Sequence, residues 1–73
     1  MTIEQKVGKA IIKIRKQKGF SQENFAYEAG IGRRYMSDIE NGKRQVSVNV
    51  VYRVCQKLGL SLSEFFKVVE ESQ

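Results

Sequence analysis

Glycine is the only strong helix breaker in this sequence, because the chain has six glycines and no proline. Gly19, Gly30, Gly42 and Gly59 each follow a stretch with helical apolar spacing, and Gly42 completes an Asn-Gly turn pair. Glycine is favoured just past a helix end because it adopts the left-handed backbone conformation without steric cost. The glycine spacing therefore predicts five short helices and an all-α fold.

The first three segments each carry apolar residues at the i, i+3, i+4 spacing of one helix face. We expect helices at about residues 3–18, 22–28 and 32–40, the second of them capped by Ser21. Lysines occupy the opposite face of the first helix. The residues predicted to face inward are Ile3, Val7, Ala10, Ile11, Ile14, Phe25, Ala26, Ala29, Met36 and Ile39.

The fourth segment fits two secondary structures. Val and Tyr alternate at period two from residue 46 to residue 54, which is typical of a strand. A helix capped by Ser47 and stopped by Gly59 would instead gather its buried residues on one face. These residues are Val51, Val54, Cys55 and Leu58. We expect the helix, with a buried and redox-inactive Cys55, because no other segment supplies a strand to pair with.

The fifth segment carries the clearest helix start. Ser61 and Glu64 form a capping-box pattern, and Leu60 with Phe65 forms a hydrophobic staple, so a helix is predicted over about residues 62–70. Its apolar face is wide for a helix at the end of the fold. In one interpretation Leu62, Phe65 and Val69 cover the core. In the other, a two-fold interface with a second copy contains Phe66, Val68 and Val69.

Composition counts against several classes of protein. The chain has no histidine and one cysteine, which removes the usual zinc ligand sets, the Ser/His and Cys/His catalytic pairs and any internal disulfide. We expect no enzyme, no metal or other cofactor and no small-molecule ligand. No segment approaches the roughly 20 apolar residues of a membrane span, so we expect a cytoplasmic protein. Residues 1–73 are predicted to form one domain with a small core.

Positive charge is concentrated in the first part of the chain. The net charge is +5, and residues 1–44 hold ten Lys and Arg against five Asp and Glu, whereas residues 45–73 hold three of each. A solvated basic face would explain this pattern as well as a binding surface does. Combined with the apolar fifth helix, it favours a polyanion partner for the first part and self-association for the second.

Two short helices joined at one glycine, between a basic helix and two apolar ones, are typical of a helix-turn-helix at about residues 22–40. Ala26 supplies a small residue where the two helices cross, and Gly30 permits the turn. The stretch QENFAYEAGIGRRYMSDIENG, residues 22–42, resembles the lambda-repressor-like (Cro/cI, or XRE) family of DNA-binding domains. The likeness extends from Val7 to Phe66 and includes the phrase KLGLSLSEFF.

The resemblance implies a role for each matching residue. It places four side chains of the third helix at base edges in the DNA major groove, namely Arg33, Arg34, Ser37 and Asp38. It implies contacts to the DNA backbone from Gln22, Tyr35, Asn41, Lys43 and Arg44. It also implies a structural ion pair between Arg15 and Glu40.

The chemistry of these side chains suits base contacts. Arginine pairs bidentately with guanine O6 and N7, and we expect Arg34 to be the main guanine contact. Asp38, one turn further on, is expected to orient Arg34 or to accept from cytosine N4. The sequence departs from the family at Gly32, where a Ser or Thr cap is usual. Gly32 lacks the side-chain oxygen that would cap the third helix.

The resulting functional hypothesis is a sequence-specific regulator of transcription that binds a pseudo-palindromic double-stranded DNA operator as a homodimer. The profile resembles the stand-alone controller proteins of restriction-modification systems, and phage Cro or repressor proteins share it. A protein-binding module of the antitoxin type is the alternative from another class. RNA binding is disfavoured because no exposed aromatic platform is apparent.

Overall fold

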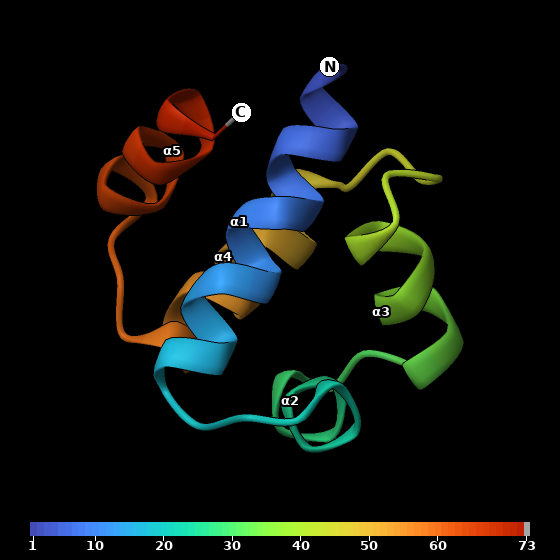
Figure 1. Cartoon of the computed structure of the whole chain (residues 1–73). Coiled ribbons are helices and arrows are strands. Elements are labelled where there is room, and N and C mark those ends of the chain that lie inside the picture. Colours follow the sequence, from blue (N-terminus) through green and yellow to red (C-terminus); the bar gives the residue numbers. More distant parts are fainter. Residues whose placement is uncertain (73) are drawn as a thin grey trace.

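The computed structural model describes residues 1–72, and this part of the chain folds into five α-helices without a strand (Figure 1). The predicted domain, residues 1–73, therefore ends one residue outside the described part. The helices are α1 (Ile3–Gln17), α2 (Gln22–Ala29), α3 (Arg33–Glu40), α4 (Val48–Leu58) and α5 (Leu62–Glu71). Helix α1 lies at the centre of the fold, between α3 and α5, with α4 behind it and α2 across its C-terminal end. The prediction of a five-helix, all-α fold is confirmed.

Local capping explains where the helices begin and end. Ser21, Ser47 and Ser61 each accept a hydrogen bond from the backbone N–H three residues on, as their positions in the sequence predicted. The capping box of α5 is present, with the Ser61 N–H donating to Glu64 Oε1 at 2.8 Å. Helices α2 and α4 both end at glycines in the left-handed conformation, with φ values of 69° and 72°.

The core is a single apolar cluster with residues from all five helices. Nine of the ten inward-facing residues predicted for the first three helices are buried. The exception is Ile3, which is 57% exposed because it is the first residue of α1. Its prediction as a core residue was wrong. The largest side chains sealed inside are Phe25, Phe65, Ile11, Met36, Ile39 and Leu58.

Helix α4 settles the ambiguity of the fourth segment in favour of the helix. The four residues predicted on its inner face are buried, while Val48 and Tyr52 of the alternating pattern are exposed. Burial raises the pKa of the Cys55 thiol, so this side chain stays protonated and behaves as a small apolar residue. No helix within residues 1–72 has the length and apolar content needed to cross a membrane.

Helix α5 divides its apolar residues between the core and the surface. Phe65 and Val69, one turn apart, are both fully buried, whereas Phe66 is 39% exposed and Val68 is partly buried. The assignment of Val69 to an interface between copies was therefore wrong, because the face it shares with Phe65 packs onto the core. Leu62, predicted to cover the core, is instead exposed at the start of the helix.

Candidate nucleic-acid interface

The turn between α2 and α3 is fixed by backbone hydrogen bonds and by buried side chains. The Ile31 N–H donates to the Ala26 carbonyl at 2.9 Å, and Arg53 of α4 donates to the Gly30 carbonyl at 3.4 Å. Ala26 and Ile31 are buried. Phe25, Met36 and Ile39, from the two helices, are fully buried beside them. The two helices therefore form the predicted helix-turn-helix, with α3 in the position of the recognition helix.

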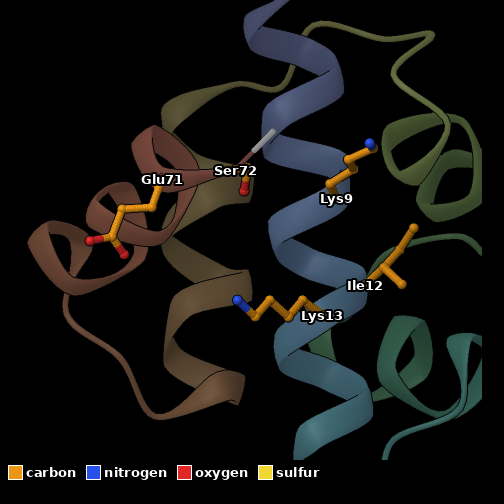
Figure 2. A pocket seen from close by; sticks show the side chains of 5 residues that line it. All are labelled: Lys9, Ile12, Lys13, Glu71 and Ser72. Atoms are coloured by element: carbon orange, nitrogen blue, oxygen red, sulfur yellow. The ribbon is translucent and has the colours of Figure 1, made fainter. Parts of the chain in front are cut away.

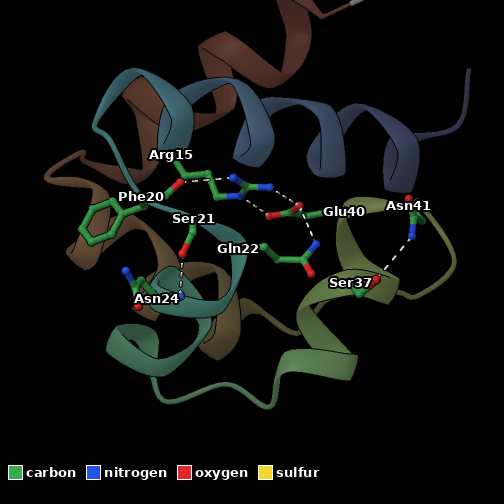
Figure 3. Close-up of polar contacts among 8 residues, drawn as sticks. All are labelled: Arg15, Phe20, Ser21, Gln22, Asn24, Ser37, Glu40 and Asn41. Atoms are coloured by element: carbon green, nitrogen blue, oxygen red, sulfur yellow. Dashed lines mark hydrogen bonds and ion pairs between the residues drawn. The ribbon is translucent and has the colours of Figure 1, made fainter.

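A buried polar network holds the C-terminal end of α3 against α1 and α2 (Figure 3). Arg15 donates to both oxygens of Glu40, from Nε at 2.7 Å and from Nη2 at 2.9 Å. Its Nη1 also donates to the Phe20 carbonyl at 3.2 Å. The hydrogen bond to Glu40 raises the pKa of Arg15, so the guanidinium stays charged.

Gln22, at the first position of α2, joins the same network. Its Nε2 donates to Glu40 Oε1 at 3.0 Å (Figure 3). A side-chain amide nitrogen carries two hydrogens, so the second N–H of Gln22 remains available to an outside acceptor. Gln22 thus lies between the buried carboxylate of α3 and the solvent side of α2.

Gly8 allows α1 to approach the end of α3 unusually closely, and sequence reasoning missed this. A Cβ built on Gly8 would lie 2.5 Å from the Ile39 carbonyl oxygen and 2.6 Å from that of Glu40. Both neighbours are backbone atoms that cannot rotate away. The signal that could have revealed the contact is a glycine in a helix interior, where it costs about 1 kcal/mol relative to alanine.

The exposed face of α3 carries the four predicted base-contacting residues. Arg33 and Arg34 are exposed, and Ser37 and Asp38 are half-buried. Arg33 lies 3.6 Å from a carboxylate oxygen of Glu23 on α2, and both side chains are well exposed. Arg34 has no ion-pair partner within the described chain.

Asp38 pairs with Arg44 and not with Arg34. Arg44 Nε lies 3.8 Å from Asp38 Oδ2, so the prediction that Asp38 orients Arg34 was wrong. The reason is that the loop after α3 folds back along the helix, with the Lys43 N–H donating to the Asp38 carbonyl at 2.9 Å. This return brings Arg44 beside the recognition helix.

The other residues predicted to contact the DNA backbone surround this face. Asn41 Nδ2 donates to Ser37 Oγ at 3.5 Å (Figure 3), and Lys43 is exposed. Tyr35 is partly buried, and the Arg44 guanidinium lies 4.9 Å from the centre of its ring. Helix α3, the loop that follows it and the start of α2 therefore hold all nine predicted DNA-contacting residues. Their DNA contacts stay predictions.

A shallow hollow lies elsewhere, between α1 and the C-terminal end of α5 (Figure 2). It has a volume of about 340 Å³ and is lined by Lys9, Ile12, Lys13, Glu71 and Ser72. The amino groups of Lys9 and Lys13 point in opposite directions, and Glu71 points outward (Figure 2). The hollow therefore lacks the converging polar groups that orient a small ligand. Within residues 1–72 no cluster of Cys, Asp and Glu could hold a metal ion.

Comparison with known proteins agrees with this geometry. The family model described as helix-turn-helix matches residues 11–65. The chain is 41% identical over 70 residues to the control protein C.MunI from Mycoplasma sp, covering 94% of this chain and 95% of that one. It is 39% identical over 54 residues to the control protein C.BamHI from Bacillus amyloliquefaciens, covering 73% of this chain and 67% of the relative.

A solved structure is similar over almost the whole chain. It is that of the restriction-modification controller protein C.Esp1396I, a tetramer in complex with its natural 35 base-pair operator, with a TM-score of 0.87 and 31% identity. The match covers 97% of this chain and 93% of that one. The chain therefore belongs to the lambda-repressor-like (XRE) helix-turn-helix family of transcriptional regulators, and restriction-modification controller proteins are among its relatives.

Proposed function

We propose that this protein binds a two-fold-symmetric double-stranded DNA operator as a homodimer, regulates its own promoter as a restriction-modification controller does, and is not an enzyme. The observation that carries the proposal is an exposed basic face on a helix whose other end is fixed in the core. The controller C.Esp1396I supports it, because that relative is a tetramer on its operator. A DNA target of this kind places the protein in the cytoplasm, at the nucleoid.

Arg34 is the main base contact in this proposal. Its guanidinium is exposed and unpaired among the described residues, so binding guanine O6 and N7 costs no existing ion pair. A good bidentate contact of this type contributes about 1–3 kcal/mol of discrimination against the wrong base. Arg33 lies about 100° away around the helix and keeps Glu23 as a neighbour, so it contacts phosphate. Ser37, one turn from Arg33 and Arg34, completes the base-contacting face.

The backbone contacts come from the residues around α3. Gln22 donates one N–H to Glu40 and can donate its second N–H to a phosphate. Because Glu40 belongs to α3, a phosphate bound by Gln22 is held at a fixed position relative to α3. Asn41, Lys43, Arg44 and the Tyr35 hydroxyl contact the backbone on the other side. Each phosphate neutralised by Lys or Arg steepens the dependence of log K on log salt by about 0.9.

The dimer contact is proposed at Phe66 and Val68 of α5. Phe66 borders a hollow of about 300 Å³ whose other lining residues include Ile3, Val7, Val46 and Val51. Ile3 and Phe66 are both exposed apolar side chains, and the chain from residue 45 onward has equal numbers of acids and bases. Two copies can meet there without strong charge repulsion, so the proposed occupant of this hollow is a second copy.

The operator proposal is tested by selecting bound duplexes from a random DNA pool at two salt concentrations. We expect enrichment of a two-fold-symmetric motif that persists at the higher salt, with half-sites about one helical turn apart. Binding without enrichment, lost at higher salt, would contradict the proposal and favour a protein partner of the antitoxin type.

The dimer proposal is tested by sedimentation of a Phe66→Asp variant. A buried unpaired carboxylate is costly, so we expect a folded monomer that binds the operator weakly. Tyr27→Asp is the matched control, because Tyr27 is also an exposed aromatic residue but lies on α2. A Phe66→Asp protein that still sediments as a dimer would remove this interface.

A further inference from the structure

Three side chains meet at the exposed side of the recognition helix and form what we call the Arg44 cluster, Tyr35, Asp38 and Arg44. The Arg44 guanidinium lies over the Tyr35 ring, 4.9 Å from its centre, and Arg44 Nε lies 3.8 Å from Asp38 Oδ2. Tyr35 and Asp38 are three residues apart on α3, so their side chains are neighbours on one side of the helix. Arg44 is thus contacted by an aromatic face and by a carboxylate.

The backbone turn after α3 determines the position of Arg44. Gly42 takes a left-handed conformation with φ of 71°, and the following Lys43 N–H donates to the Asp38 carbonyl. The chain therefore turns at Gly42, beside the last turn of α3, and the Arg44 side chain reaches back to Asp38 and Tyr35. Asp38 contributes twice, through its carbonyl to the loop and through its carboxylate to Arg44.

We propose that Asp38 and Tyr35 hold the Arg44 guanidinium against the recognition helix before DNA binds, so that Arg44 enters the interface already oriented. Asp38 is then a positioning residue and not a contact to cytosine. The proposal rests on the proposed DNA-binding function and assigns different roles to Arg34 and Arg44. The Arg34 side chain has no ion-pair partner among residues 1–72 and can adopt the conformation that guanine requires, whereas the Arg44 side chain is oriented before DNA binds.

The physical benefit is entropic. A free arginine has many rotamers, and fixing it during binding costs free energy that is lost from the affinity. A guanidinium held by a ring and a carboxylate has already lost much of that freedom in the folded protein. Exposed cation–π contacts and exposed ion pairs are each weak, so the cluster directs Arg44 without preventing its transfer to DNA.

The geometry can be tested without DNA. Protons above an aromatic ring resonate upfield, so we expect the Arg44 side-chain protons of the wild-type protein to lie upfield of those of Arg53. In a Tyr35→Leu variant this displacement disappears, and in Asp38→Asn it decreases, because the guanidinium then leaves the ring more often. Equal shifts for Arg44 and Arg53 in the wild type would overturn the proposal, whatever the protein binds.

The consequence for binding is tested by a double-mutant cycle between Asp38→Asn and Arg44→Ala on the selected operator, at two salt concentrations. We expect Asp38→Asn alone to weaken operator binding by about three- to tenfold relative to Glu28→Gln, which removes the same charge, and to do so much less in the Arg44→Ala background. Arg44→Lys keeps the charge but not the planar group, so Asp38→Asn should have little effect on operator binding in this background as well.

Glu28→Gln is the matched control for this cycle. Glu28 is an exposed acid on α2 with no partner in residues 1–72, and its variant changes the net charge by the same amount as Asp38→Asn. Its effect should add to that of Arg44→Ala. If the effects of Asp38→Asn and Arg44→Ala also add, or if Asp38→Asn relaxes one cytosine position only, the positioning role is overturned. If the Tyr35→Leu protein fails to fold, the double-mutant cycle between Asp38→Asn and Arg44→Ala still decides the proposal.

The two proposals fail in different ways. An upfield Arg44 signal in a protein that selects no DNA motif would contradict the proposed function while keeping the Arg44 cluster. A selected motif with additive effects of Asp38→Asn and Arg44→Ala would keep the function and remove the positioning role.

Discussion

The two ends of α3 are built differently. At the C-terminal end, Glu40 is buried, accepts hydrogen bonds from Arg15 and Gln22, and has its backbone in close approach to Gly8. At the N-terminal end, Gly32 provides no side-chain cap, and the first two residues of the helix are exposed arginines. A helix of eight residues therefore has one end fixed in the core and one end open to solvent.

The difference shows how a small domain can hold a binding helix firmly and still leave it accessible. The fixed end determines the direction of α3, because it is joined to both α1 and α2. The open end presents backbone N–H groups and positive charge, and helix N-termini attract phosphate for this reason. Changes at the fixed end should therefore alter stability, and changes at the open end should alter binding.

Glu40→Ala should have the largest effect on stability. It leaves the buried Arg15 guanidinium without its carboxylate, and removing one partner of a buried ion pair costs about 3–5 kcal/mol. Urea denaturation measures the loss. Glu23→Ala is the control, because its ion pair with Arg33 is exposed and should contribute only about 0–1 kcal/mol. Equal losses in the two variants would contradict the distinction between a fixed and an open end.

Gly8→Ala should have the next largest effect, through packing alone. The added methyl group meets two backbone carbonyl oxygens, and overpacking of this kind costs about 1–3 kcal/mol. Gly32→Ala is the matched control, because a Cβ at Gly32 has open space around it. Urea denaturation of both variants should show a large loss for residue 8 and a small one for residue 32. Alanine also favours the helix by about 1 kcal/mol, so only a Gly8→Ala protein that gains about this much stability would show that α1 and α3 can separate without cost.

Arg34→Ala should leave stability within about 0.5 kcal/mol, because the side chain is exposed and unpaired among residues 1–72. Its effect should appear in DNA binding, as a loss of about 1–3 kcal/mol that relaxes one base position of the selected motif. Arg33→Ala is the comparison, expected to weaken all sequences alike and to lower the salt dependence. If Arg34→Ala also weakened all sequences alike, its role as the guanine contact would be lost.

Features that depend on neighbouring residues in the sequence could be predicted. The serine caps, the glycine ends and the inward faces of α2, α3 and α4 follow from spacing, because each is decided within one or two turns of helix. The fourth segment needed one further step, since its alternating valines suit a strand as well. The absence of a pairing partner decided it correctly.

The packing of α5 and the course of the loop after α3 could not be predicted from spacing, although the family resemblance did supply the Arg15–Glu40 pair between α1 and α3. Periodicity puts Phe65, Phe66 and Val69 on one apolar face, but the packing of α5 on the core decides that only Phe66 reaches the surface. The pairing of Asp38 was missed for the same reason. Its partner Arg44 comes from a loop that folds back at Gly42, whereas helical spacing considers only Arg34.

Gly32→Ser should have the smallest effect of these substitutions, and the direction of its effects on Tm and on operator binding is informative. A serine oxygen at this position can accept from a backbone N–H of the first turn of α3, which should stabilise the protein by a few tenths of a kcal/mol, about 0.3. For a domain of this size that corresponds to a rise in Tm of about 1–2 °C. The same oxygen would then occupy an N–H group that the open end offers to a phosphate. We therefore expect a slightly higher Tm by calorimetry together with weaker operator binding in a titration, whereas a variant that gains in both would show that the first turn of α3 does not meet the DNA backbone.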